Sequence, residues 1–334
     1  MNLLKISGSP HVHTSNSTPS IMYGVVYAMI PAMLVSFYFF GLDAVRVILI
    51  SVIGCMAVEY LIQKYLLKSE ITVFDGSAIV TGVLLAFNVP SNLPWWILII
   101  GAIVSIGIGK MSFGGLGKNI FNPALVGRVF LLISFPVQMT SWPIPQPGFK
   151  MPLADAITGP TPLGILKEGL AGGKTVEEIM PDIPNYVENL MTGFQGGSLG
   201  EVSAIALLLG AIYMFYRKII TWHTPMAYLG SAVIFSGILW LSDPTYYVDP
   251  LFHVVTGGMI LGVFYMATDM VSSPMSAKGQ LVFGAGAGIL TILIRVYGAY
   301  PEGVSFAILI MNAFVPLIDM AFKPTRFGEV VAKN

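Results

Sequence analysis

Residues 22–40 read MYGVVYAMIPAMLVSFYFF, a stretch without a single charged side chain. A transmembrane α-helix needs about 20 predominantly apolar residues, so this stretch predicts a membrane span. Comparable apolar runs recur along the chain. The sequence therefore predicts an all-α polytopic membrane protein with about ten transmembrane helices, at residues 22–40, 45–66, 77–89, 95–110, 121–136, 202–217, 224–242, 251–268, 280–297 and 303–321.

The composition supports this fold class and excludes several functions. Of the 334 residues, 55% are hydrophobic and 10% are charged, whereas soluble domains carry about 25% charged residues. The net charge of zero gives no electrostatic reason to expect nucleic acid as a partner. The single cysteine, Cys55, excludes an internal disulfide and a four-thiolate iron–sulfur cluster held by this chain alone. The four histidines form no zinc or haem motif, so we expect no metal site.

Two of the ten segments, 77–89 and 121–136, are short and bounded by polar and helix-breaking residues. Broken helices of this kind usually line a cavity rather than face lipid. Weak similarities relate the two halves of the chain: residues 81–87 resemble 256–262, and 122–126 resemble 312–316. Since each half has five spans, an odd number, the sequence predicts two inverted repeats. A glycine-rich run at residues 284–288 is typical of close helix packing.

The positive charges predict the topology. Lys and Arg concentrate in the segments that are cytoplasmic if the N-terminus is cytoplasmic. The first 20 residues lack the apolar core of a cleavable signal. The predicted parts are a cytoplasmic tail, a first membrane repeat, an extracytoplasmic loop, a second membrane repeat and a second cytoplasmic tail, at residues 1–21, 22–136, 137–201, 202–321 and 322–334.

The predicted outer loop contains the run Asp155-Ala156-Ile157-Thr158-Gly159-Pro160-Thr161. One interpretation is a threonine offered for covalent modification by another enzyme, which needs an exposed peptide with small neighbours. Gly159 would supply backbone freedom and Asp155 a nearby carboxylate. The alternative is an ordinary turn in a loop rich in Gly and Pro.

Other polar residues lie in or beside the spans. Asn119 and Asn122 are three apart, so in a helical turn they share one face, and their amides can both donate and accept hydrogen bonds. Simple capping of a helix that begins with proline explains them equally well. Asp269 ends the eighth span, where it is either a functional carboxylate or a solvated interfacial one. Arg128 lies within the fifth span and must pair with an anion, a carbonyl cluster or water.

The run from Asp155 to Thr161 resembles the flavinylation motif of the membrane subunits of Rnf complexes and of sodium-pumping NADH:quinone oxidoreductases. Further motifs similar to this family occur in the same order: Ser9-Pro10-His11 before Ile21-Met22, Asp75-Gly76-Ser77 before Thr81-Gly82, Gly117 to Ala124, Ala267-Thr268-Asp269 and Pro301-Glu302-Gly303. Together they span nearly the whole chain. The short polar N-terminal tail resembles the Rnf branch of this family, in its D-type subunits. The B-type subunits of the quinone reductases usually have a longer extension there.

This resemblance implies FMN bound covalently through a phosphoester to Thr161, and the flavin phosphate is one anion with which Arg128 could pair. It also implies a second, non-covalent flavin, riboflavin, near Thr81, Asn119, Asn122 and Asp269. Where the family commonly has alanine, this chain has Pro160, which stiffens the peptide that a transferase must grip. No catalytic residue is expected, because the flavins carry the chemistry.

The implied protein is one component of a ferredoxin:NAD oxidoreductase in a prokaryotic cell membrane, and it is not self-sufficient as an enzyme. It would relay electrons between the two flavins, coupled to Na⁺ or H⁺ transport. Expected partners are a second flavinylated subunit, iron–sulfur subunits, a flavin transferase and the lipid bilayer. The alternatives are the equivalent component of a sodium-pumping quinone reductase, a solute channel or secondary transporter, and a purely structural anchor.

Overall fold

The computed structural model describes residues 17–145, 148, 158–183 and 197–323. Within these residues the chain is helical throughout, apart from turns and one isolated β-bridge between Pro143 and Thr158. Six helices are long and apolar enough to cross a membrane. They are α1 (Thr18–Phe40), α2 (Leu42–Leu61) extended by η1 (Ile62–Leu67), α4 (Trp95–Ala102) extended by η3 (Ile103–Ile108) and η4 (Met111–Phe113), α11 (His223–Ser242), α14 (Ala277–Tyr297) and α15 (Val304–Ala321).

Shorter helices account for the remaining predicted segments. Three are apolar helices of 10–17 residues: α3 (Ser77–Phe87), α5 (Pro123–Ser134) and α10 (Ala204–Tyr216). The predicted eighth span is broken into α12 (Pro250–Val255), α13 (Met259–Leu261) and η6 (Gly262–Met266). Small elements complete the fold: η2 (Val73–Asp75), α6 (Pro136–Met139), α7 (Pro162–Ala171), α8 (Val176–Ile179) and η5 (Met180–Asp182). The predicted polytopic all-α fold is confirmed.

A polar residue followed by proline begins three of the shorter helices. Asn122, Thr161 and Asp249 are the N-caps of α5, α7 and α12, and each is followed by proline. Their side-chain oxygens accept hydrogen bonds from backbone N–H groups of the first helical turn, which have no partner within the helix. Proline fits the next position, because its missing N–H would be unpaired there in any case.

Glycines allow α14 to approach α11 closely. A Cβ on Gly284 would lie 2.6 Å from the carbonyl oxygen of Thr224 and 3.1 Å from the backbone nitrogen of Tyr228. Gly288, one turn later, faces Tyr228 and Ala232 of the same helix. The predicted role of the glycine run in helix packing is confirmed.

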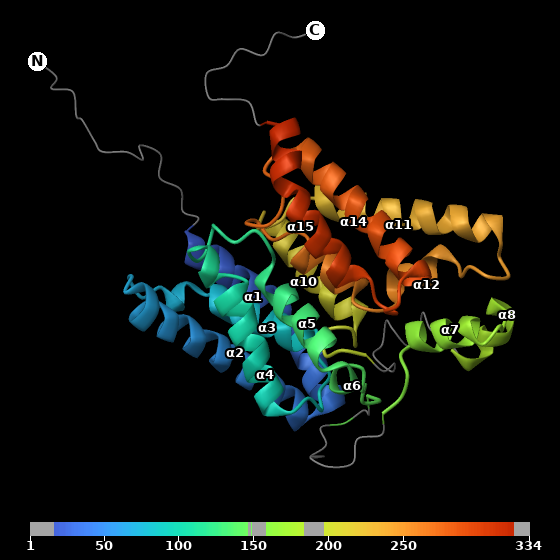
Figure 1. Ribbon diagram of the computed structural model, residues 1–334, viewed down its shortest axis with the longest axis horizontal. Coiled ribbons are helices and arrows are strands. Elements are labelled where there is room, and N and C mark those ends of the chain that lie inside the picture. The colour runs from blue at the N-terminus through green and yellow to red at the C-terminus, as the bar shows by residue number, and fades with distance from the viewer. Residues whose placement is uncertain (1–16, 146–147, 149–157, 184–196, 324–334) are drawn as a thin grey trace, which may run out of the picture.

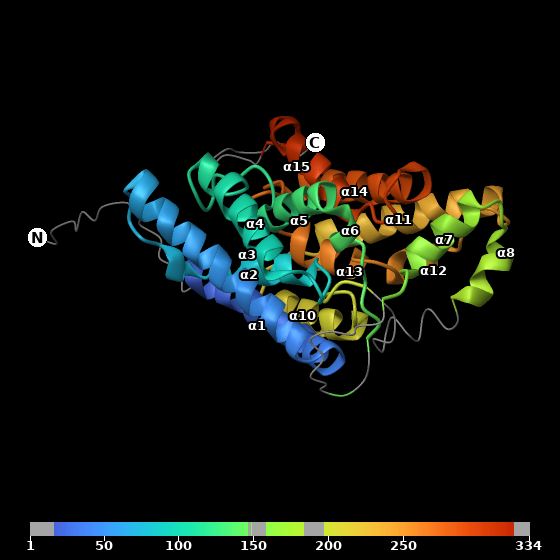
Figure 2. The ribbon, with the colours of Figure 1, turned by 60° about the horizontal axis from the view of Figure 1, so that its bottom comes forward.

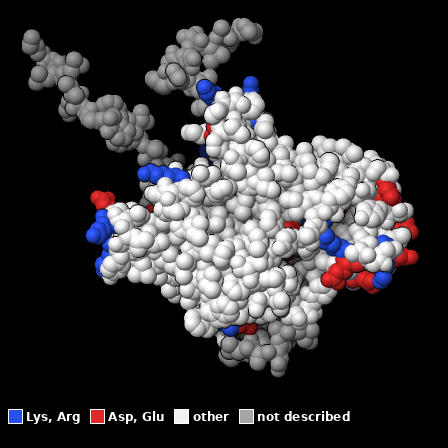
Figure 3. Space-filling view, in the orientation of Figure 1, with Lys and Arg blue, Asp and Glu red and all other residues white. Residues whose placement is uncertain are grey.

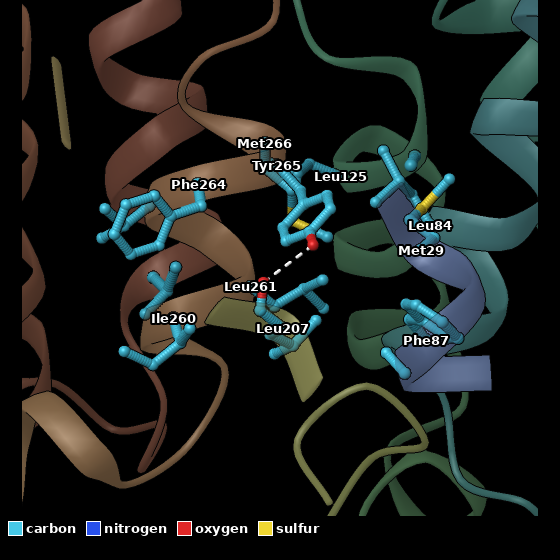
Figure 4. Packing of buried hydrophobic residues seen from close by; sticks show 14 of the residues in the cluster. Met29, Leu84, Phe87, Leu125, Leu207, Ile260, Leu261, Phe264, Tyr265 and Met266 are labelled. Carbon is cyan, nitrogen blue, oxygen red and sulfur yellow. Dashed lines mark hydrogen bonds between the residues drawn. The ribbon is translucent and has the colours of Figure 1, made fainter. Parts of the chain in front are cut away.

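The buried apolar core is formed by helices from both halves of the chain. Figure 4 shows side chains from α1, α3, α5, α10 and the broken segment α13–η6 packed together. The hydroxyl of Tyr265 donates hydrogen bonds to the carbonyl oxygens of Leu207, at 2.9 Å, and Ala28, at 3.2 Å. One buried tyrosine thus joins η6 to α1 and α10, and gives carbonyls inside the bundle a polar partner.

The small helices α7 and α8 lie at one end of the molecule, with α12 beside α7 (Figures 1 and 2). Leu163 and Leu166 of α7 share an apolar cluster with Val248 and Phe252. The described part of the predicted outer loop is therefore partly helical and packed against the membrane helices.

Figure 3 shows a broad face without charged side chains between two charged ends. Acidic side chains gather over α7 and α8, and basic ones near the far end of α2 and the ends of α1 and α15. This division is typical of a membrane protein with an apolar belt.

Candidate functional site

The four residues expected near a second flavin line one pocket, which we call the asparagine pocket. Thr81 comes from α3, Asn119 and Asn122 from the approach to α5, and Asp269 from the turn after η6. The space between the lining residues is about 730 Å³, part of it open to the outside. Its remaining walls come mainly from the start of α1 and the end of α10, including Met22, Val25, Met214 and Ile219.

Hydrogen bonds fix the two asparagines differently. Asn122 caps α5, and its Nδ2 donates to the carbonyl oxygen of Met266 at 3.3 Å. Asn119 donates through Nδ2 to the carbonyl oxygen of Phe121 at 3.0 Å, while its Oδ1 is buried without a partner among the described residues. Capping accounts for Asn122, but the amide oxygen of Asn119 is an acceptor that the protein leaves unused. Buried polar atoms normally have partners, so this oxygen fits a ligand N–H.

The other two predicted residues of this pocket are held locally. Thr81 Oγ1 donates to the carbonyl oxygen of Ser77 at 3.0 Å. The carboxylate of Asp269 accepts hydrogen bonds from Ser272 Oγ at 2.8 Å and from the backbone of Val271 at 3.3 Å. Burial raises the pKa of Asp269 above its ordinary value. Asp269 is therefore a turn-forming carboxylate at the pocket, not a freely solvated one.

A buried ion pair borders the same pocket and was not predicted. Lys110, which lines the pocket, donates to Glu59 at 2.7 Å and 2.8 Å and to Ser77 Oγ at 2.6 Å. Both charged residues are 1% exposed. The available signal was one acidic and one basic residue in two apolar runs, 45–66 and 95–110.

Thr161 lines a second pocket, which we call the threonine pocket. The space between its lining residues is about 670 Å³, and Arg128 is also in its wall. The other lining residues are Leu132, Thr140, Trp142, Pro162, Leu163, Glu201, Gly257, Tyr300, Pro301 and Glu302. The structure thus brings Arg128 and Thr161 together across 33 positions of sequence.

Thr161 is fixed rather than displayed on a loose turn. Its Oγ1 accepts a hydrogen bond from the backbone N–H of Gly164 at 3.1 Å, as the N-cap of α7. Gly159 donates its backbone N–H to Trp142 at 3.0 Å, and a Cβ there would lie 3.1 Å from Ile144. Gly159 has no positive φ, so its local conformation does not itself require glycine. Asp155 lies outside the described residues.

Arg128 pairs with an acidic side chain of the protein itself. It forms a salt bridge with Glu302, donates to Ser305 Oγ, and donates through Nε to the carbonyl oxygen of Asn88 at 3.3 Å. The backbone N–H of Gly258 donates to Glu302 Oε1 at 3.0 Å. Although burial opposes ionisation, Arg128 and Arg295 hold the pKa of Glu302 below its ordinary value. Of the options that the sequence left open for Arg128, an acidic partner and a carbonyl are both used.

Glu201 is the other carboxylate of the threonine pocket, and sequence reasoning missed it along with Glu302 and Trp142. Among the described residues, no salt bridge joins Glu201 to a basic side chain. Burial and the neighbouring Glu302 carboxylate raise the pKa of Glu201 to about 7. Glu302 appeared only within the family-like run Pro301-Glu302-Gly303, and nothing in the sequence joined these three residues, because they come from segments far apart in the chain.

Comparison with known proteins places the chain among membrane subunits of redox complexes. The model of the NQR2, RnfD, RnfE family matches residues 5–328. The chain is 46% identical to the D-type subunit of the Na⁺-translocating ferredoxin:NAD⁺ oxidoreductase complex of Acetobacterium woodii, covering 99% of this chain and 97% of the relative. It is 42% identical to the proton-translocating counterpart of Clostridium ljungdahlii, covering 98% and 97%. It is 36% identical to the D-type subunit of the ion-translocating oxidoreductase complex of Escherichia coli, covering 98% and 99%.

Proposed function

The chain belongs to the NQR2, RnfD, RnfE family, and from that premise we propose that it is the D-type membrane subunit of an Rnf-type ion-translocating oxidoreductase complex. The full-length identity to three proteins of that description supports this proposal. The chain is then one part of a redox enzyme, and partner subunits supply the NAD site and the iron–sulfur clusters.

The proposed cofactor of the threonine pocket is FMN, esterified through its phosphate to Thr161. Three features of the chain support this. Thr161 begins a ten-residue helix, whose N-terminus favours negative charge such as a phosphate diester. Arg128, although paired with Glu302, places a guanidinium group in the wall of the same pocket. Trp142 offers an aromatic surface for a planar ring.

The proposed ligand of the asparagine pocket is a non-covalent flavin such as riboflavin. The observation that carries this proposal is the unpaired Oδ1 of Asn119, buried in a pocket that also contains Thr81, Asn122 and Asp269. The edge of a flavin ring has an N–H group that can donate a hydrogen bond to this oxygen. The apolar walls of the pocket suit the rest of the ring.

The two pockets suggest an electron relay across the membrane. Flavins accept and release electrons, and the chain holds and orients them on opposite sides of the core. We place the threonine pocket outside and the asparagine pocket toward the cytoplasm, with both termini cytoplasmic in a prokaryotic inner membrane. Relatives of this length are named for either Na⁺ or proton translocation, so the transported ion is Na⁺ or H⁺. Maturation then requires a flavin transferase, and a second flavinylated subunit is an expected partner.

Counting flavin on the natively assembled complex tests this function. Mass spectrometry of the peptide containing Thr161 should show one added FMN, and acid should release about one further flavin per chain. A Thr161→Ala variant should lose only the covalent flavin. An Asn119→Leu variant should release several-fold less flavin and keep the FMN on Thr161. A native complex with neither flavin contradicts the proposal and favours a solute channel, a secondary transporter or a structural anchor.

A further inference from the structure

Two carboxylates face the threonine pocket in unequal settings. The Oε1 atoms of Glu302 and Glu201 lie 2.7 Å and 3.5 Å from the position that a Cβ on Gly258 would occupy. The two carboxylates therefore lie close to each other, next to Gly258. Glu302 is tied to Arg128, whereas Glu201 accepts a hydrogen bond from Ser198 Oγ at 2.8 Å. Glu201 is thus the carboxylate that can change its charge without breaking an ion pair.

The backbone around Glu201 is rigidly held. The N–H of Gly200 donates to the carbonyl oxygen of Phe87 at 2.9 Å, and Ser36 Oγ donates to that of Leu199 at 2.7 Å. A Cβ on Gly200 would lie 2.7 Å from Phe87 and 2.9 Å from Leu261. The segment therefore packs tightly against α3 and α13, which fixes the backbone position of Glu201. Glu201 itself is partly exposed, which leaves it a path to water.

The charges around Glu201 are balanced before any cofactor is added. Glu302 lies before α15, Arg128 is on α5 and Arg295 is on α14, and all three act on Glu201 electrostatically. With Glu201 ionised, two arginines offset two glutamates. A phosphate diester at Thr161 adds one negative charge to this pocket, and an electron on its ring adds another. Because Glu201 is only partly exposed, excess negative charge beside it favours proton uptake.

We propose that Glu201 takes up a proton from the outer aqueous side when an electron reaches the flavin attached to Thr161. This inference rests on the proposed function, since it requires that flavin. A reduced one-electron carrier in a partner subunit supplies the electron, water supplies the proton, and the new O–H bond forms on the Glu201 carboxylate. The net charge of the pocket is unchanged by the step, and the proton returns to water when the electron leaves. Glu201 is a positioning residue, because it acts on the flavin through its charge.

The pKa of Glu201 agrees with this role. Burial and the Glu302 carboxylate raise the pKa of Glu201 to about 7. Below that pH, Glu201 is already protonated and takes up nothing on reduction. Above it, Glu201 is ionised before the electron arrives and protonated afterwards. A phosphate diester at Thr161 raises this pKa further, so proton uptake by Glu201 should add to the fall of the flavin midpoint potential with rising pH only above about pH 7.

A redox titration of the covalent flavin in the purified complex, followed by its absorbance from pH 6 to 9, tests this. For one proton per electron the potential changes by about 59 mV per pH unit, so wild type should show an added slope of up to that size above pH 7. Glu201→Gln should remove the added slope, and Glu201→Asp should retain it. Glu168→Gln, an exposed carboxylate of α7, is the matched control and should behave as wild type.

The outcomes are separable. Equal slopes in wild type and Glu201→Gln overturn the role of Glu201 while leaving the flavoprotein intact. Absence of FMN on Thr161 in the wild type overturns the proposed function, and this inference with it. Thermal unfolding and the FMN mass on Thr161 should be the same in Glu201→Gln and wild type. A Glu201→Gln variant that unfolds or loses FMN would make Glu201 structural, and Glu201→Asp then decides: a folded, flavinylated variant without the added slope also overturns the proposal.

Discussion

Among individual residues, Glu59 and Lys110 form a buried pair that is costly to disturb. Both side chains are almost fully buried, at 1% and 2% exposure, and they meet at 2.7 Å. Removing one member of such a pair leaves an uncompensated charge, which typically costs about 3–5 kcal/mol. We therefore expect Glu59→Gln to lower the stability of the protein by about that amount.

The only cysteine offers a direct measurement of this loss. Cys55 is fully buried, so a fluorogenic thiol reagent reports unfolding in detergent during a temperature ramp. Glu59→Gln should unfold at a clearly lower temperature. The double variant Glu59→Gln with Lys110→Met should recover part of the loss, because it removes both charges. Equal unfolding temperatures for Glu59→Gln and wild type would contradict a buried ion pair.

Sequence reasoning found some residues of the pockets but not their partners. Asn119, Asn122 and Arg128 were singled out because a polar side chain in an apolar run needs an explanation. Glu201 and Glu302 lie in polar segments, where a carboxylate needs none. Only the packing of the segment before α10 and the turn before α15 reveals that both carboxylates line the same pocket as Arg128.

Among the helices, the contact between α11 and α14 depends on a missing side chain. A Cβ on Gly284 would lie 2.6 Å from the carbonyl oxygen of Thr224, closer than any real contact allows. Gly284→Ala should therefore force the two helices apart and cost about 1–3 kcal/mol.

Gly230 on α11 is the matched control. A Cβ there would meet nothing within 4 Å, and alanine is about 0.5–1 kcal/mol more favourable than glycine inside a helix. In the same thiol assay, Gly284→Ala should lower the unfolding temperature, whereas Gly230→Ala should hold or raise it. A drop of the same size in both variants would contradict a specific role of Gly284 at the helix contact, because helix propensity alone favours alanine at both positions.

The helices themselves could be predicted because lipid imposes a simple rule. A span must be apolar and must satisfy its backbone internally, so length and composition reveal it. The helices α7 and α8 obey no such rule. They form because Leu163, Leu166 and Ile179 find an apolar partner surface near Val248 and Phe252, and that surface exists only in the folded molecule.

For the molecule as a whole, the orientation in the membrane is open to a labelling experiment. Lys174 lies after α7, in the predicted outer region, and Ser112 lies in η4, in the predicted cytoplasmic region. Both are exposed, and the native Cys55 is buried. Lys174→Cys should react with a membrane-impermeant maleimide in intact cells, whereas Ser112→Cys should react only after lysis. The reverse pattern would invert the topology and place the threonine pocket inside.

The way α7 begins at Thr161 has a consequence for how far an attached group can travel. Thr161 caps the helix, and the next turn of α7 is anchored through Leu163 and Leu166. A group bonded to Thr161 Oγ1 is attached at a fixed position, so the distance it can move is limited by the length of its own linker. A swinging arm that shuttles between distant sites is therefore excluded. If Thr161 carries the proposed FMN, electron donors and acceptors must dock within that short radius of the start of α7.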